Sequence, residues 1–115
     1  HQVYTAVAVF RARDGNTWTD FGATDVPMRP YSDAEMRAYV ASGDPMDKAG
    51  AYAIQNPDFD PAPDLQGCFA NVVGLPLCHL TRTLTKMGLS PQKDIPAVCQ
   101  SALEYNCPIY QTILS

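Results

Sequence analysis

A turn signal between two runs of strand-forming residues constrains the fold of this chain more than any other feature. Residues 3–10 place apolar side chains on both faces of an extended segment, which is typical of a strand inside a sheet. An Asp-Gly-Asn turn follows at 14–16, and residues 17–28 are rich in Thr, Trp, Phe and Val. The pattern predicts an antiparallel hairpin, closed by Pro27 and Pro30.

A capped helix is expected after the hairpin. Ser32 and Glu35 form a capping-box signature, in which each side chain accepts a hydrogen bond from the other residue's backbone N–H. The spacing predicts a helix over 33–42, ended by Gly43 and by Pro45 beyond it. Its expected apolar face consists of Met36, Tyr39 and Val40.

The middle of the chain combines irregular segments with one short apolar run. Residues 44–55 fit neither the helical nor the strand period. Residues 56–66 contain three Pro and three Asp, which predicts an exposed loop. This loop exceeds the usual connection length of about 4–6 residues, so we interpret it as an insertion. Cys68–Val73 is expected to form a third strand.

A second helix and a tail complete the predicted order of elements. Pro76 is expected to occupy the first helical position, and Gly88 to end the helix. The apolar stripe of this helix consists of Leu77, Leu80, Leu84 and Met87. Residues 90–115 are expected to hold one short helix near 96–104, and the segment 107–110 is expected to be extended or coil. The order β-β-α-loop-β-α indicates a mixed α/β fold without a regular βαβ repeat.

Length and charge exclude several classes of protein. The chain has 115 residues, the size of one domain, assigned here to 1–115. Lys and Arg number 8 against 12 Asp and Glu, and the net charge of −4 argues against a nucleic-acid binder or a polybasic membrane-surface protein. No apolar run approaches the roughly 20 residues of a membrane span. The first residue is His1 and no signal-peptide layout follows, so we expect the chain to be cut from a longer protein.

The four cysteines carry no metal-binding or redox spacing. No pair has CxxC spacing, so buried free thiols are the favoured interpretation, with disulfides or a metal site as alternatives. Cys78 and His79 are adjacent, which is not a zinc-ligand spacing. A Cys/His nucleophile pair would lack a third group. We expect His79 to be a surface or capping residue of its helix.

The segment 43–55 carries the residue types that are best suited to binding a ligand. Lys48 and backbone N–H groups beside small residues suit a phosphate. The Tyr52 ring and the Gln55 amide suit a nucleotide base. The competing interpretation is an ordinary loop after a helix, in which Asp47 and Lys48 form a solvated pair.

The segment 71–77 offers a second candidate. Gly74 permits a turn before the predicted helix, whose N-terminus could bind an anion, although packing alone also explains the sequence. The fingerprints GxGxxG, GxxxxGK[ST], GxSxG and HExxH are absent.

Together these stretches resemble the Maf family of nucleoside triphosphate pyrophosphatases. The similarity lies in Ser-Asp-x-Glu-Met at 32–36, in the run from Tyr39 to Gln55, and in Gly-x-Phe-x-Asn-Val-Val-Gly-Leu-Pro-Leu at 67–77. The opening His-x-Val-Tyr-Thr at 1–5 also resembles a segment from the middle of a Maf domain.

The resemblance covers about residues 1–88 and leaves 89–115 as a C-terminal extension. Asp-Lys-Ala-Gly-Ala-Tyr at 47–52 is similar to the branch that prefers dTTP and UTP, and differs from the branch that acts on 7-methyl-GTP. The resemblance implies a three-layer α/β/α fold with a mixed sheet, like that of inosine-triphosphate pyrophosphatases, with its N-terminal part missing from this chain.

The implied activity is hydrolysis of dTTP, UTP or modified nucleotides to a monophosphate and pyrophosphate, assisted by Mg²⁺ or Mn²⁺. Members of the family are cytoplasmic, often homodimeric, and linked to septum formation. The resemblance implies a nucleotide substrate and neither a nucleic-acid polymer nor a membrane as partner. It assigns Gln55 as the active-site glutamine and no metal ligand. It assigns as substrate-binding positions Lys48, Asp47, Tyr52, Gly50 and Thr5.

Several departures from the family pattern shape the expected function. Family members carry a Ser-x-Arg phosphate-binding segment, a Glu, further Lys residues and the catalytic Asp before the segment where this chain starts. We therefore expect this chain alone to lack part of the catalytic apparatus. Asn56 replaces a usual Gly, and the 56–66 loop is richer in Pro. Arg29 is a further candidate, with a solvated Arg favoured.

Two other interpretations stay open beside the enzyme. The first is a non-catalytic nucleotide-binding or structural portion of the same fold. The second, weaker, is that a separate partner chain completes the site.

Overall fold

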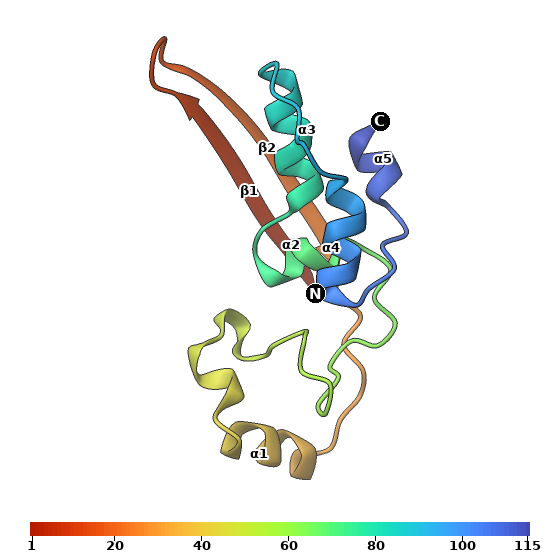
Figure 1. Ribbon diagram of the computed structural model, residues 1–115. Coiled ribbons are helices and arrows are strands. Elements are labelled where there is room, and N and C mark those ends of the chain that lie inside the picture. Colours follow the sequence, from red (N-terminus) through yellow and green to blue (C-terminus); the bar gives the residue numbers. More distant parts are fainter.

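The computed structural model describes residues 1–115 as a long β-hairpin with helices gathered on one side and a separate helical arm at one end (Figure 1). The molecule measures 54 × 27 × 21 Å, and its radius of gyration of 16.4 Å exceeds the roughly 13 Å of a compact domain near this length. In chain order the elements are β1 (Gln2–Arg11), β2 (Asn16–Asp25), α1 (Asp33–Ala41), the 3-10 turns Asp44–Asp47 and Ala49–Ala51, α2 (Phe69–Val73), α3 (Leu77–Lys86), α4 (Ile95–Leu103) and α5 (Tyr110–Leu114).

The predicted antiparallel hairpin is confirmed. Strand β1 pairs with β2 in a register that runs from Gln2 opposite Asp25 to Arg11 opposite Asn16. Strand β2 ends at Asp25, opposite Gln2 at the start of β1, three residues before the expected boundary. Alternate side chains on one face of the hairpin are covered by α2 and α3, which Figure 1 shows alongside the strands.

The other face of the hairpin is open and apolar. Its large exposed side chains are Tyr4, Phe10 and Phe21. The sheet contains only these two strands, so neither strand has a neighbour at its outer edge. The mixed α/β class is confirmed, but the expected three-layer architecture is not present in residues 1–115.

The segment expected to form a third strand is helical, which corrects that prediction. Asn71 of α2 is fully buried, and its Nδ2 donates to the carbonyl oxygen of Val3 and to Oγ1 of Thr24, at 2.9 Å each. Thr5 Oγ1 donates to the Asn71 carbonyl oxygen. A short apolar run fits a buried helix as well as a buried strand, and these hydrogen bonds to the hairpin favour the helix.

The capping box of α1 forms as predicted. The Ser32 backbone N–H donates to Glu35 Oε2 at 2.8 Å, and the Glu35 N–H donates to Ser32 Oγ at 3.2 Å. The predicted apolar face is wrong, because Met36 and Val40 are exposed. Only Tyr39 is buried, and its ring stacks on Phe59 with centroids 4.1 Å apart.

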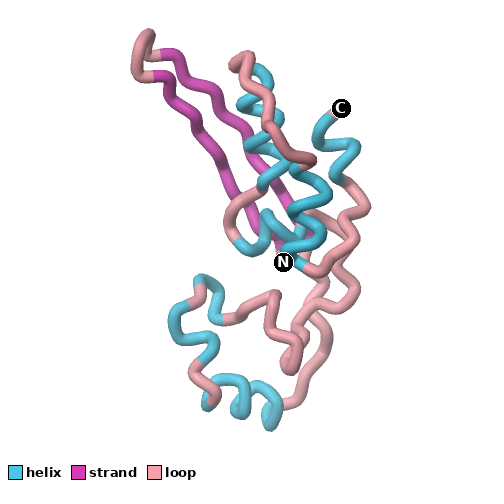
Figure 2. Tube along the Cα trace, in the orientation of Figure 1, coloured by secondary structure: helices cyan, strands magenta, loops and turns pink.

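The 56–66 segment lacks helix and strand, as Figure 2 shows, but it is not the exposed loop that its composition predicts. Phe59, Pro61, Ala62 and Leu65 are buried. Ala62 and Leu65 form one core cluster with Val26 and Ile54. The apolar residues between the acidic ones therefore anchor the segment to the end of β2.

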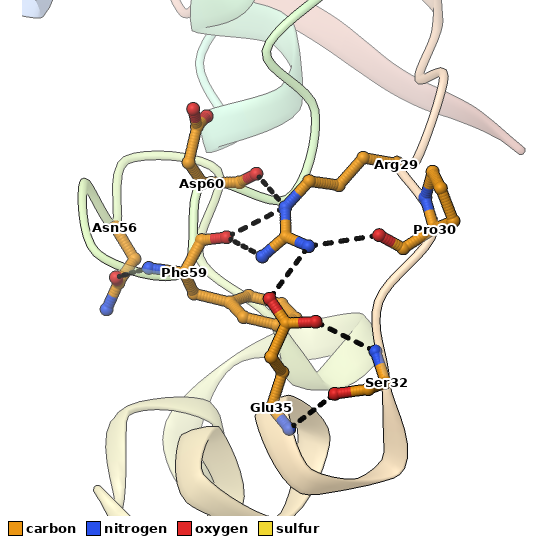
Figure 3. A network of polar contacts seen from close by, with 7 residues as sticks. All are labelled: Arg29, Pro30, Ser32, Glu35, Asn56, Phe59 and Asp60. Atoms are coloured by element: carbon orange, nitrogen blue, oxygen red, sulfur yellow. Dashed lines mark hydrogen bonds and ion pairs between the residues drawn. The ribbon is translucent and has the colours of Figure 1, made fainter.

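Arg29 holds the same segment, so the interpretation of a solvated Arg is wrong. Its guanidinium donates to the carbonyl oxygens of Phe59 and Asp60 and pairs with Glu35 at 3.1 Å (Figure 3). A side chain engaged in this way ties the loop to the start of α1.

Helix α3 starts at Leu77, one residue later than expected, and its most buried side differs from the predicted leucine stripe. Its fully buried side chains are Cys78, His79 and Thr83. The prediction of a surface or capping His79 is wrong because the ring lies over Gly22, which has no side chain to obstruct it.

The C-terminal region is partly as expected. Helix α4 confirms the helix predicted near 96–104. Residues 107–109 have no helix or strand, as expected, but the sequence analysis did not predict α5, which begins at Tyr110. Helix α5 docks because Ile113 is buried with Cys68, Ala70 and Cys78 in a second core cluster. None of the helices has both the length and the apolar character that crossing a membrane requires.

Candidate functional site

An open cleft of about 400 Å³ lies between the first residues of β1, the segment 48–55 and the end of α2. Its volume falls within the roughly 300–1,000 Å³ of small-molecule sites. The cleft brings together four of the sequence-predicted site residues, namely Lys48, Gly50, Tyr52 and Gln55. The opposite wall includes His1, Val3, Tyr4, Val72 and Val73.

The segment 48–51 turns sharply along one wall of the cleft. Gly50 has φ of 76°, in the left-handed region that glycine adopts without a steric penalty. Ala51 follows with φ of 58°, and Tyr52 returns to an extended conformation. The small residues between Lys48 and Tyr52 therefore leave the backbone accessible from the cleft.

Lys48 supplies the cation of the site. Its Nζ lies 2.6 Å from Oδ1 of Asp47, whose side chain is largely exposed. This hydrogen bond raises the pKa of Lys48 and lowers the pKa of Asp47, so both groups are charged at neutral pH. Asp47 does not line the cleft, and the structure places it as the neighbour that orients Lys48.

Tyr52 provides an aromatic surface fixed by the core. Its ring packs against the cluster that contains Val26 and Ile54, and burial raises the pKa of its phenol. The His1 ring meets Tyr52 edge to face at a centroid distance of 5.5 Å, with His1 Nε2 lying 2.9 Å from Tyr52 Oη. The phenol therefore stays neutral and able to donate a hydrogen bond at neutral pH.

Gln55 presents a side-chain amide to the cleft. Its side chain is exposed, whereas Ala53 and Ile54 immediately before it are buried. The next residue, Asn56, accepts hydrogen bonds at Oδ1 from the backbone N–H groups of Asp58 and Phe59. Asn56 thus begins a turn that redirects the chain at the position where the resemblance places glycine.

Sequence reasoning missed the residue that anchors this segment from behind. The Tyr39 hydroxyl donates to Oδ2 of Asp44 and accepts the backbone N–H of Ala53 at 2.9 Å. Burial, followed by the hydrogen bond to Asp44, raises the pKa of Tyr39. The sequence offered one signal for this role: Tyr39 lies on the predicted inner face of a helix, and a buried Tyr needs a hydrogen-bond partner for its hydroxyl.

Thr5 is placed apart from the cleft, because its hydroxyl is engaged by the Asn71 carbonyl oxygen. The anion-binding interpretation of the start of α3 stays a prediction: Asn71 and Pro76 are buried, whereas Val73 and Leu75 between them are exposed. No group of three His, Cys, Asp or Glu side chains in residues 1–115 is arranged to hold a metal ion.

The comparisons with known proteins agree with the motifs that surround the cleft. A family model described as Maf-like protein matches residues 1–87. The chain belongs to the Maf family. No solved structure matches it.

Relatives with curated names add a more specific similarity. The chain is 47% identical over 92 residues to a dTTP/UTP pyrophosphatase of Dehalococcoides mccartyi, covering 80% of this chain and 41% of the relative. It is 42% identical over 113 residues to one of Thermomicrobium roseum, covering 95% and 49%. It is 51% identical over 87 residues to one of Salinibacter ruber, covering 73% and 42%. The chain thus spans less than half the length of these relatives.

Proposed function

We propose that this chain is the nucleotide-recognising portion of a nucleoside triphosphate pyrophosphatase that acts on dTTP and UTP. The observation that carries the proposal is the cleft in which Lys48, Tyr52 and Gln55 converge. The names of the relatives favour the same substrates.

The chemistry of the three side chains suits a pyrimidine nucleotide. A Gln amide both donates and accepts hydrogen bonds, so Gln55 can pair with a carbonyl oxygen and a neighbouring ring N–H. Uracil and thymine present that combination. The Tyr52 ring offers a stacking surface, and Lys48 offers a cation for a phosphate oxygen. In this proposal Gln55, Tyr52 and Lys48 all contact the nucleotide, and Gln55 keeps the active-site role that the resemblance implies.

Hydrolysis between the α- and β-phosphates needs charge neutralisation and a positioned water, and Mg²⁺ or Mn²⁺ supplies these in many phosphoryl-type reactions. We include such a cation in the proposal for the whole activity. Residues 1–115 provide no arranged ligand set for it, so no step is assigned through the cation.

Nucleotide titration followed by NMR tests the recognition step on the chain as it exists. UTP and dTTP are expected to shift the Gln55 side-chain NH₂ signals and the Tyr52 ring signals more than ATP does. Gln55→Ala is expected to weaken UTP binding about 2–10-fold, the value of one hydrogen bond. Gln92→Ala, at an exposed site outside the cleft, is the matched control. Unchanged affinity and base preference in Gln55→Ala would overturn the role of Gln55.

An assay for monophosphate and pyrophosphate tests the hydrolytic step. The chain is incubated with UTP or dTTP in the presence of Mg²⁺ or Mn²⁺. Release of both products supports the enzyme. Binding without release by this chain, with release by a longer Maf-family chain that contains it, supports the enzyme, because this chain spans less than half the length of its relatives. Binding without release by both favours the second candidate, a non-catalytic nucleotide-binding portion of the fold.

A further inference from the structure

All four cysteines of the chain line a single cavity. They come from four places in the sequence: Cys68 just before α2, Cys78 in the first turn of α3, Cys99 in α4, and Cys107 between α4 and α5. The cavity measures about 10 Å³, which is no more than the space of about one water molecule. A site of this size takes no organic ligand, so its chemistry is that of the thiols with one another.

The thiols differ in accessibility. Cys68 and Cys78 are each 5% exposed, and burial raises the pKa of Cys78 to about 11. Cys99 and Cys107 are half-buried and therefore within reach of a small oxidant. The thiolate is the form that attacks a disulfide, and deep burial disfavours that form. Burial raises the pKa of Cys99 as well, so accessibility to an oxidant, and not the pKa, distinguishes Cys99 and Cys107 from the other two cysteines.

The chain after α4 folds back onto the end of the helix that carries Cys99. Glu104 adopts φ of 50°, which reverses the chain at the end of the helix. The Tyr105 N–H then donates to the Gln100 carbonyl oxygen at 3.1 Å, and the Cys107 N–H donates to Gln100 Oε1 at 2.8 Å. Cys107 is therefore held beside the residue that directly follows Cys99.

We propose that Cys99 and Cys107 form a disulfide when the protein meets a small-molecule disulfide such as oxidised glutathione. The thiolate of one cysteine attacks the oxidant and releases one glutathione thiolate, giving a mixed disulfide. The second cysteine then attacks the protein sulfur of that mixed disulfide and releases the second glutathione. Overall the two protein thiols lose two electrons and two protons, and the oxidant is reduced to two thiols.

The disulfide closes the loop 99–107 and fixes the segment that leads into α5. Helix α5 contributes Ile113 to the core cluster that contains Cys68 and Cys78. The closed loop is short, and loop closure in the unfolded chain is expected to raise the thermal midpoint by about 5 °C or more. Oxidation therefore strengthens the attachment of the C-terminal residues without a change in the cleft.

The test exposes the folded, reduced chain to oxidised glutathione and measures intact mass and disulfide position. Formation of the bond lowers the mass by about 2 Da. Trypsin and a Glu-specific protease together separate 49–82, which carries Cys68 and Cys78, from 94–104 and 105–115. The expected product is 94–104 joined to 105–115, released by dithiothreitol.

Variants and an unfolded control define the outcomes. Cys99→Ser and Cys107→Ser are each expected to abolish the mass loss and the rise in midpoint, while Cys78→Ala retains both. In urea the 68–78 link is expected to form about as readily as the 99–107 link, because both close short loops in an unfolded chain. A 68–78 link in the folded chain would overturn the proposal. Linkage of 49–82 to either C-terminal peptide in the folded chain would overturn the proposal. So would stable glutathione adducts without an intrachain bond.

Discussion

Arg82 of α3 donates two parallel hydrogen bonds to the Asp20 carboxylate of β2, from Nε to Oδ2 at 2.7 Å and from Nη2 to Oδ1 at 2.8 Å. The Asp20 side chain is 12% exposed and the Arg82 side chain 29%. Arg82 Nη1 also donates to the Ile113 carbonyl oxygen of α5. One guanidinium thus connects the hairpin, the central helix and the C-terminal helix.

Removal of the Asp20 charge is expected to destabilise the protein. In Asp20→Asn one amide replaces a carboxylate that accepts two charge-assisted hydrogen bonds, leaving Arg82 incompletely paired. We expect the free energy of unfolding to fall by about 1–2 kcal/mol, between the values of exposed and fully buried pairs. Urea unfolding measures the change. Asp14→Asn, in the exposed hairpin turn, is the control and should cost less. Equal losses in both variants would contradict this assignment.

Stability is expected to fall in two steps as the pH is lowered. Burial holds the pKa of His79 below its ordinary 6.5. As the pH falls below 6.5, His79 therefore binds a proton in the unfolded state before it does so in the folded state, and stability declines. The hydrogen bond from Arg82 holds the pKa of Asp20 below 3.8, so its contribution is lost only as the pH falls further. Thermal midpoints between pH 8 and pH 3 measure both steps. Asp20→Asn should remove part of the lower step and should also lower the pKa of His79 further, because the Asp20 charge partly offsets the effect of burial on that ring. An unchanged profile would refute the assignment.

A side chain at Gly22 is expected to disrupt the contact between the hairpin and α2. A Cβ there would lie 2.6 Å from Asn71 Oδ1 and 3.2 Å from His79 Cε1. Because Asn71 is fully buried and hydrogen-bonded, it has little room to move. Gly22→Ala should cost about 1–3 kcal/mol in urea unfolding, the range of overpacked cores. Ala23→Ser, on the exposed face of the same strand, should stay within about 0.5 kcal/mol. A neutral Gly22→Ala would show that α2 shifts freely.

Loss of the Tyr39 hydroxyl is expected to loosen the segment that carries Gln55. Tyr39→Phe keeps the stacking on Phe59 but leaves the Ala53 N–H without its acceptor. We expect a loss of about 1–3 kcal/mol in stability and weaker UTP binding at a temperature where the variant is fully folded. Tyr31→Phe, at an exposed ring on the same side of the molecule, is the control. NMR titration with UTP measures affinity. Lower stability with unaltered affinity would limit Tyr39 to a structural role.

Local sequence signals correctly predicted the elements that are stabilised by residues near one another in the sequence. The hairpin follows from its turn and its strand-forming runs, and α1 follows from the reciprocal bonds of Ser32 and Glu35. Their formation requires no knowledge of distant residues. The α2 segment depends on Asn71, whose partners lie in β1 and β2, and its helical state could not be read from a short apolar run.

Which side chains are buried depends on contacts between distant segments, and the hydrophobic periodicity of the sequence does not encode these contacts. The acidic and Pro-rich composition of 56–66 obscured Ala62 and Leu65, which complete a core with residues from two other segments. His79 is buried because Gly22, far away in sequence, leaves space for its ring. Both corrections arise from packing partners outside the local sequence window.

The sequence predicted only part of the candidate site. The motif at 47–55 grouped Lys48, Tyr52 and Gln55, and the structure places all three on one cleft. Thr5 belongs to a matching motif position but is engaged by α2. Tyr39 positions the segment through a hydrogen bond from the Ala53 backbone N–H. No residue pattern indicates from which main-chain N–H group a distant hydroxyl will accept a hydrogen bond.

The two-stranded sheet has a consequence for amide hydrogen exchange. In an antiparallel ribbon, each strand directs every second N–H toward its partner and the others outward. With no neighbour at either outer edge, β1 and β2 should show slow and fast amides in strict alternation along the chain. Any polypeptide that pairs with an edge would slow the fast set of that strand alone. The exchange pattern therefore reports, strand by strand, how many neighbours the sheet has in solution.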